Sequence, residues 1–184
     1  MVSDCGLKYN ILRNLKKRGC SITVVPVTAT AEEVLAYKPD GVLFSPGPGD
    51  PSLLNYAVKM VEDIIGKIPV MGICLGHQLI ARAFGAATYK LKFGHHGGNH
   101  PVKDLFTNRV YITAQNHGFA VDAATLPNGL EISHINLNDD TVEGMIHKDL
   151  PVMGIQFHSE AAPGPWDNEY LFDRFLNMVK EVAK

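Results

Sequence analysis

The first half of the chain alternates short apolar runs with stretches in which apolar residues recur at helical spacing. The runs predict buried strands at 22–25, 41–44 and 70–73, and the spacing predicts helices at 10–18, at 56–65 and from Leu75 onward. Thr30 and Glu33 have the spacing of a capping box, which predicts the start of a short helix. Strands that alternate with helices in this way indicate a parallel, doubly wound sheet.

The second half differs, because strand candidates follow one another with few helices between them. These candidates span 110–113, 130–134, 141–146 and 152–156. A helix from about Asn168 closes the chain, with one apolar face made of Leu171, Phe172, Phe175, Leu176 and Val179. We therefore predict an α/β fold, a doubly wound and mostly parallel sheet with antiparallel additions, in a single domain of residues 1–184.

The composition is that of an ordinary globular protein. It limits the kinds of partner to expect but says little about the function. The 184 residues are 46% hydrophobic and 20% charged, with a formal net charge of −2. The chain has no basic patch, which argues against nucleic acid as a partner. No apolar run approaches the roughly 18 residues of a membrane span and no secretory signal is recognisable, so no membrane partner is expected. Cys5, Cys20 and Cys74 are widely spaced and odd in number, which favours a reduced, cytoplasmic setting.

Cys74 lies where a predicted strand turns into a predicted helix, between Gly72 and Gly76. This is the G-x-nucleophile-x-G elbow, with sulfur where related hydrolases carry a hydroxyl. At the N-terminus of a helix, unpaired N–H groups and the positive end of the dipole favour a thiolate and can stabilise an oxyanion. The alternative interpretation is a small core cysteine that ends a strand, so a nucleophile needs a matching base elsewhere in the chain.

His158 and Glu160 follow another predicted buried strand, in the sequence QFHSE. In an extended chain the two side chains point to the same side, so the carboxylate can orient the imidazole. Such pairs alone are weak evidence, since they also occur by chance on surfaces. Because ligands gather at the carboxyl ends of parallel strands, Cys74, His158 and Glu160 together predict an acyl-transfer site with a nucleophile, a base and an orienting acid.

Three further polar segments allow weaker interpretations. The loop PGPGD at 46–50 lets backbone N–H groups approach a ligand, but it lacks the lysine of a phosphate loop and by itself is more typical of a tight turn. The segment GHHGGNH at 94–100 contains no Asp, Glu or Cys, so we expect a loop and no metal site. The segment NHGF at 116–119 predicts a polar turn that is either a plain loop or a substrate contact. The remaining candidates are interpreted as structural or solvent-facing: Cys5, Cys20, His77, His134 and His147.

Several blocks of the sequence resemble a known family. GICLGHQ, QFHSE and PGPGDP are similar to motifs of the triad (class I) glutamine amidotransferase domains, whose fold is flavodoxin-like. FGHHGGNHPV, ITAQNHGFAVD and HSEAAPGPWDNEYLFDRF resemble the glutaminase half of the carbamoyl-phosphate synthetase small subunit. The resemblance covers nearly the whole chain from Asp4. In that family a further domain precedes this one, so we expect residues 1–184 to be the amidotransferase domain without the N-terminal domain.

The resemblance implies a reaction and a role for each matching residue. Cys74 would attack the side-chain amide of L-glutamine to form a glutamyl thioester, which water hydrolyses to glutamate. His158 would act as base and then as acid, and Glu160 would orient it. Backbone N–H groups of Leu75 and Gly47 would meet the oxyanion. The implied substrate-binding positions are Gly47, Gly49, Leu75, Gln78, Asn116, Gly118 and Phe119.

The resemblance also implies a partner protein. The ammonia would pass to a large synthetase subunit that makes carbamoyl phosphate from bicarbonate and ATP, for arginine and pyrimidine biosynthesis. It implies neither a cofactor nor a metal on this chain. Two alternatives stay open: a free-standing hydrolase that uses the same elbow, such as a cysteine peptidase or a γ-glutamyl hydrolase, and a non-catalytic binding module that keeps the fold.

Overall fold

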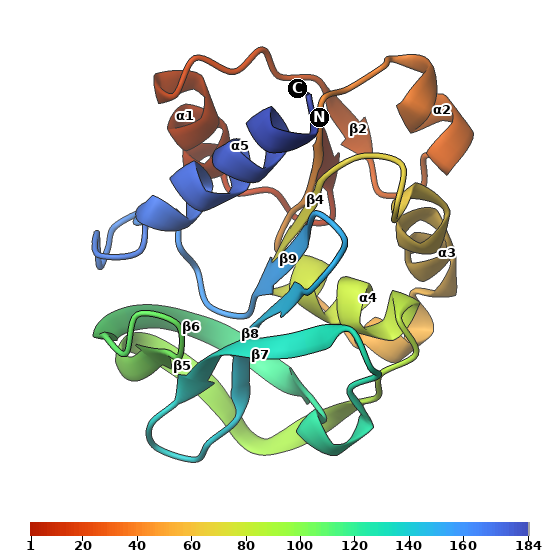
Figure 1. Ribbon diagram of the computed structural model, residues 1–184. Coiled ribbons are helices and arrows are strands. Elements are labelled where there is room, and N and C mark those ends of the chain that lie inside the picture. Colours follow the sequence, from red (N-terminus) through yellow and green to blue (C-terminus); the bar gives the residue numbers. More distant parts are fainter. Residues whose placement is uncertain (184) are drawn as a thin grey trace.

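The computed structural model describes residues 1–183, in which the strands form one mixed sheet with helices on both faces (Figure 1). The strand order in this part of the chain is β2-β1-β3-β4-β9-β8-β7-β5-β6. Neighbouring strands run parallel from β2 to β9, through β2 (Val24–Pro26), β1 (Val2–Asp4), β3 (Val42–Phe44), β4 (Val70–Ile73) and β9 (Val152–Ile155). The predicted parallel sheet is therefore confirmed.

The remaining strands of the sheet pair antiparallel and extend it on the far side of β9 (Figure 1). They are β8 (Val142–His147), β7 (Leu130–Asn136), β5 (Thr88–Asp104) and β6 (Val110–Val121). The strand β8 joins the two parts, because it pairs with β9 on one side and with β7 on the other. The predicted α/β fold with antiparallel additions is confirmed.

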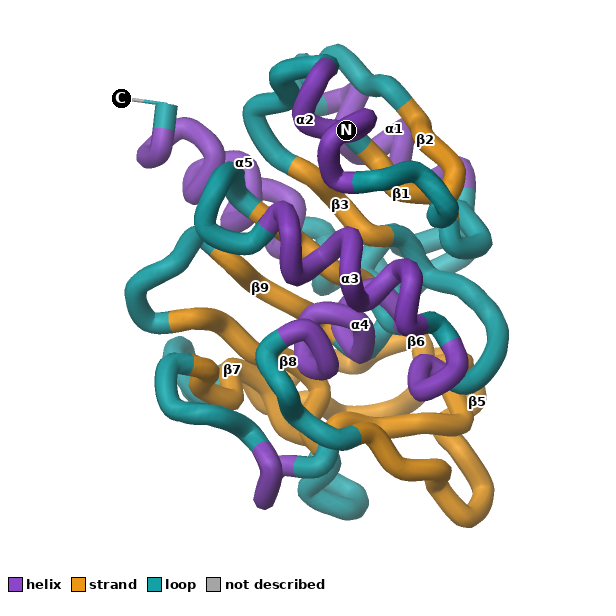
Figure 2. Tube along the Cα trace, turned by 90° about the vertical axis from the view of Figure 1, so that its right-hand side faces the viewer, coloured by secondary structure: helices purple, strands orange, loops and turns teal. Residues whose placement is uncertain are grey.

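Two layers of helices cover the parallel part, one on each face (Figures 1 and 2). The first layer holds α1 (Tyr9–Lys17) and α5 (Tyr170–Val182), and the second holds α2 (Ala31–Ala36), α3 (Asn55–Ile64) and α4 (Leu75–Ala83). Short 3-10 turns lie at η1 (Pro51–Leu53) and η2 (Ala123–Thr125). Burial of the apolar stripe of each helix against the sheet produces two separate cores, so both faces stabilise the same strands.

Local signals in the sequence account for several helix ends. The capping box at α2 is formed, since Thr30 Oγ1 accepts a hydrogen bond from the N–H of Glu33 and the Glu33 carboxylate accepts one from the N–H of Thr30, at 3.2 and 2.8 Å. The helix α1 stops just before Gly19, whose φ of 84° is easily adopted only by glycine. Both expectations are confirmed.

The segments 94–100 and 116–119 were predicted to be a loop and a turn, and both predictions are wrong. They lie inside the long antiparallel pair of β5 and β6. The pairing is interrupted by register shifts, and Gly94 and Gly97 adopt positive φ values of 71° and 115° close to them. Bulges of this kind break the alternation of apolar and polar residues that reveals a strand in the sequence, because they reverse the side to which later residues point.

The carboxyl ends of β3, β4 and β9 lie at one edge of the sheet, since these three strands are parallel neighbours. The loop after β3, the turn after β4 and the segment after β9 therefore emerge side by side. They carry the PGPGD loop, Cys74 and the His158–Glu160 pair, respectively. Among the helices of residues 1–183, none combines the length and apolar character that a bilayer crossing requires.

Candidate active site

Cys74 forms the elbow that joins β4 to α4. Its φ and ψ are 54° and −104°, an unfavourable conformation for a residue with a side chain, and the side chain is only 4% exposed. A Cβ atom at Gly72 would overlap the main chain of Gly76, and one at Gly76 would overlap the carbonyl oxygen of Phe44. Both glycines are therefore required for the tight turn that the sequence predicts.

His158 is placed beside Cys74 by the strand β6 and by its own neighbour in sequence. Its N–H donates to the carbonyl oxygen of Ala114 in β6 at 2.9 Å, and its Nδ1–H donates to Glu160 Oε1 at 2.8 Å. Burial lowers the pKa of the imidazole, but the nearby Cys74 sulfur and the bond to Glu160 outweigh it and raise the pKa to about 9. The three predicted side chains thus form one buried cluster, with Nε2 of His158 left for the sulfur.

Glu160 has a second charged partner, which sequence reasoning missed. Lys8 Nζ lies 2.8 Å from the same oxygen, Oε1, that accepts the bond from His158. The Glu160 side chain is fully buried, and burial favours its neutral form. The bonds to His158 and Lys8 outweigh this effect and hold the pKa of the carboxyl below its ordinary value. Lys8 follows the carboxyl end of β1 at the same edge of the sheet, and that position was the available signal.

The PGPGD loop lies against the elbow. A Cβ atom at Gly47 would overlap the carbonyl oxygen of Cys5 and would lie 2.7 Å from Leu75 Cδ2. Ser45 Oγ holds the start of the loop, since it accepts a bond from the N–H of Cys5 and donates to the carbonyl oxygen of Pro46, both at 2.9 Å. Gly49 has a φ of 102° in the same loop. The loop therefore brings its backbone next to Leu75, the first residue of α4, whose N–H has no partner within the helix.

Gln78 is buried one turn into α4 and joins three elements. Its Nε2 donates to the carbonyl oxygen of Phe119 in β6 at 2.8 Å and to Gln156 Oε1 at 2.9 Å. Both of its amide hydrogens are therefore used inside the protein, and only Oε1 remains free to accept a bond from a ligand.

A cavity of about 290 Å³ opens beside His158 and is lined by Lys8, Gly97, Gly98, Ala114, Gln115, Asn116, His158, Ala161, Ala162, Pro163 and Gly164. Of the predicted substrate-binding residues, Asn116 lines this cavity and is exposed, with Oδ1 3.2 Å from His96 Nδ1. Gly118 and Phe119 follow it in β6. The predicted positions Gly47, Leu75 and Gln78 lie around the elbow, and Gly49 lies in the loop after β3. None of the four is part of the lining.

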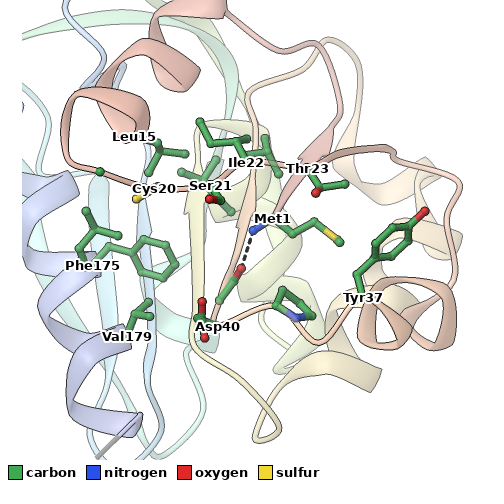
Figure 3. Close-up of a pocket in the computed structure, with 16 residues that line it drawn as sticks. Met1, Leu15, Cys20, Ser21, Ile22, Thr23, Tyr37, Asp40, Phe175 and Val179 are labelled. Carbon is green, nitrogen blue, oxygen red and sulfur yellow. Dashed lines mark hydrogen bonds between the residues drawn. The ribbon is translucent and has the colours of Figure 1, made fainter.

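A different cavity, of about 460 Å³, lies at the opposite edge of the sheet (Figure 3). Leu15 of α1, Cys20 and the α5 residues Phe175 and Val179 contribute to its wall, and the Met1 ammonium donates to the carbonyl oxygen of Gly41 at 2.8 Å. This is the amino end of the parallel strands, and none of the three clustered residues reaches it. Ligands of such sheets bind at the carboxyl ends, so we assign the chemistry to the other cavity.

A buried polar network lies beneath the site and was not predicted. The fully buried Glu143 carboxylate accepts bonds from Gln115 Nε2 and Asn136 Nδ2, each at 2.9 Å. His95 bridges Glu143 and Asp139, with ring nitrogens 3.4 and 2.9 Å from their carboxylates. The nearby Glu143 carboxylate is the main cause that raises the pKa of His95, which favours the charged form of the imidazole.

Ligand atoms of His95, His117 and Glu143 lie within 4.8 Å of one another, so we tested whether they fit a metal ion. His117 Nε2 is 2.9 Å from Gln115 Oε1 and its Nδ1 is 2.8 Å from the carbonyl oxygen of Phe119. Both Glu143 oxygens also have donors. The candidate ligand atoms of His117 and Glu143 are thus engaged with the protein, and a metal ion would have to break these bonds; His95 Nδ1 has no hydrogen-bond partner among the described residues.

A comparison with protein families agrees with the geometry. The family model of the class-I glutamine amidotransferases matches residues 1–178. The chain belongs to this family. The amidotransferase chain is 60% identical over 176 residues to the carbamoyl phosphate synthase small chain of Akkermansia muciniphila, and 56% identical over 175 residues to that of Methanocaldococcus jannaschii. These matches cover 96% and 95% of this chain but 47% and 49% of the relatives, so the amidotransferase chain spans about half of their length.

Solved structures share the fold of the amidotransferase chain. A Thermoplasma acidophilum protein assigned as a component of GMP synthase superposes with a TM-score of 0.85 at 23% identity, covering 99% of this chain and 94% of that one. A glutamine amidotransferase from Thermotoga maritima gives a TM-score of 0.70 at 19% identity, covering 99% and 84%. The predicted family and its flavodoxin-like fold are both confirmed.

Proposed function

We propose that residues 1–184 form the glutamine-hydrolysing domain of a carbamoyl-phosphate synthase small chain. The observation that carries this proposal is the buried cluster of Cys74, His158 and Glu160 at the carboxyl edge of the sheet. The match to the class-I glutamine amidotransferases and the small-chain names of the relatives support the glutaminase role and a partner subunit.

In this proposal each residue of the triad has its own step. With the thiol proton already on His158 Nε2, the Cys74 sulfur attacks the side-chain carbonyl carbon of glutamine. The oxygen of the tetrahedral intermediate meets the N–H groups of Leu75 and Gly47 at the elbow. The imidazolium gives its proton to the leaving nitrogen, and ammonia departs from a γ-glutamyl thioester. His158 then takes a proton from water, which attacks the thioester and releases glutamate and the thiol.

The substrate's amino-acid end is held by the residues around the elbow and by β6. Gln78 has only its carbonyl oxygen available, which suits the α-ammonium group of glutamine. Asn116, Gly118 and Phe119 lie along one strand next to His158 and complete the binding surface. Gly49 supports the loop that carries the Gly47 N–H.

The cavity beside His158 offers a route for the ammonia. It is lined in part by small residues, including Gly97 and Gly98, and it borders the base that protonates the leaving group. We propose that ammonia passes from here to a large synthetase subunit, which uses it with bicarbonate and ATP. The enzyme would work in the cytoplasm, in arginine and pyrimidine biosynthesis.

Replacement of the nucleophile tests this proposal. Cys74→Ala should lower glutamine hydrolysis about 10⁴-fold, because removal of one triad member disables the set. Synthesis by the complete complex with ammonia as the nitrogen source should persist. Cys20→Ala, in the other cavity, is the matched control and should keep full glutaminase activity.

The measurement is ammonia release from glutamine, with and without the large subunit. Loss of ammonia-dependent synthesis in Cys74→Ala would contradict the assigned role. Hydrolysis of γ-glutamyl peptides in preference to glutamine would favour a free-standing hydrolase.

A further inference from the structure

Asn14 lies in the middle of α1 and is 4% exposed, an unusual place for an amide. Asparagine is a poor helix former, and a buried amide without partners costs about 1–3 kcal/mol. Its Nδ2 donates to the main-chain oxygen of Glu160 at 3.3 Å and to that of Asn10 at 3.1 Å. Its Oδ1 accepts a bond from Arg18 Nη1 at 2.7 Å. Every polar atom of the side chain is therefore used, and one bond reaches the triad's acid.

Arg18 connects the Asn14 side chain to α5. Its Nε and Nη2 donate to the two Asp173 oxygens at 2.8 and 2.9 Å, and Nη2 also donates to the carbonyl oxygen of Glu169 at 3.0 Å. The guanidinium lies over the Phe172 ring, 5.5 Å from its centroid. A bidentate bond of this kind sets both the position and the orientation of the guanidinium. Asn14 is thus clamped from the side opposite to Glu160.

The bonds from Asn14 reach a peptide group that is followed by a residue in an unfavourable conformation. Ala161, directly after Glu160, has a φ of 51°, which is unfavourable for a residue with a Cβ atom. Asn10 Nδ2 donates to the same Glu160 oxygen as Asn14. The Glu160 carboxylate is held only through Oε1, since Oε2 is buried without a partner among the described residues. The main chain therefore decides where the carboxylate lies.

We propose that Asn14, held by Arg18, is a positioning residue of the amidotransferase: by fixing the peptide of Glu160 it keeps the carboxylate on His158 Nδ1. The inference rests on the proposed glutaminase function. Asn14 touches neither substrate nor the reacting atoms and acts through Glu160 alone. It also makes α5 part of the support of the triad, through Asp173 and Arg18.

Asn14→Leu tests the proposal, because leucine has nearly the shape of asparagine and is the better helix former. It should lower kcat for glutamine about tenfold or more, since small displacements of catalytic groups are costly, and it should leave KM within about twofold. Leu15→Ala is the matched control, since this neighbour is buried in the core of the same helix and makes no bond to Glu160. It should lower the Tm by more than Asn14→Leu while it keeps kcat within about twofold.

A second variant separates an effect on the position of Glu160 from an effect on the stability of the fold. Asn14→Asp keeps the acceptor for Arg18 but cannot donate to the Glu160 oxygen. The carboxylate would face the carbonyl oxygens of Asn10 and Glu160, so we expect a Tm no higher than that of the wild type, with kcat reduced. If Asn14→Leu folds poorly, this variant decides the question. Full kcat in Asn14→Asp, or an equal loss of kcat in Leu15→Ala, overturns the proposal.

Alkylation of Cys74 gives a readout that needs no glutaminase activity. The titratable groups that face His158 are Cys74 and Glu160, with Lys8 on the same Glu160 oxygen and His117 further away. A displaced Glu160 stabilises the imidazolium less, so the rate at which Cys74 reacts with iodoacetamide at a fixed pH should fall in Asn14→Leu and stay at the wild-type value in Leu15→Ala. Peptide mass spectrometry distinguishes Cys74 from the other thiols. An unchanged rate in Asn14→Leu contradicts the positioning role, whereas a wild-type chain that alkylates normally but releases no ammonia contradicts the proposed function.

Discussion

At the scale of single residues, the site depends on three side chains that are individually unfavourable where they lie. Cys74 has a positive φ, His158 carries a proton in a buried position, and Glu160 is a fully buried carboxylate. The costs at His158 and Glu160 offset each other, because the imidazolium donates to the carboxylate. Such mutual compensation is typical of an active site rather than of a structural core.

The protonation of His158 predicts how stability depends on pH. Its pKa is raised from 6.5 to about 9 in the folded chain. The stabilisation is therefore complete below pH 6.5 and is lost as the pH rises through 9. The difference in free energy of unfolding between the wild type and His158→Gln should shrink over this range, by at most about 3 kcal/mol.

Chemical denaturation at several pH values measures this difference, and the subtraction removes the contribution of groups that titrate alike in both proteins. A difference that stays constant from pH 6.5 to 9 would contradict a charged His158 in the folded state.

The sequence was sufficient for the residues that local motifs reveal. Cys74 is marked by its two glycines, and His158 and Glu160 by their spacing after an apolar run. Lys8 and Asn14 could not be found in this way, because they meet Glu160 across about 150 residues of chain. Only the order of the strands brings the start of the chain next to the segment after β9.

At the scale of elements, the β5–β6 pair was the least predictable part, and it lines the cavity beside His158. Its bulges and glycines obscure the strand pattern, yet β6 carries Asn116, Gly118 and the carbonyl oxygen that receives Gln78. The buried network of Glu143, Gln115 and His95 joins this pair to β8 and so holds β6 in position.

Glu143→Gln tests how much that network contributes to the stability of the fold. The two amide donors of Gln115 and Asn136 both point at the carboxylate, so an amide at position 143 would face one of them with its own N–H groups. We expect a loss of about 3 kcal/mol in the free energy of unfolding, measured by chemical denaturation. Asp139→Asn removes a half-exposed partner of the same His95 and should cost no more than about 1 kcal/mol. Equal losses in the two variants would show that the buried carboxylate contributes no more to stability than the half-exposed one.

At the scale of the whole molecule, the parallel strands β3, β4 and β9 bring three separate loops to one edge, and the two helix layers hold that edge in place. The alternation of strands and helices in the first half predicted this plan, because apolar periodicity is set by which face each element buries. The antiparallel part was predicted only as an addition, since its strand order depends on pairings that the local pattern does not encode.

The most direct test of the account is labelling with a glutamine-like diazoketone followed by peptide mass spectrometry. This reagent needs both the glutamine site and an activated nucleophile. We predict one adduct on Cys74, slowed by added glutamine and greatly slowed in His158→Gln, with Cys5 and Cys20 unmodified. An unlabelled Cys74, or labelling of Cys74 at the same rate without His158, would contradict the claim that these side chains form a glutaminase.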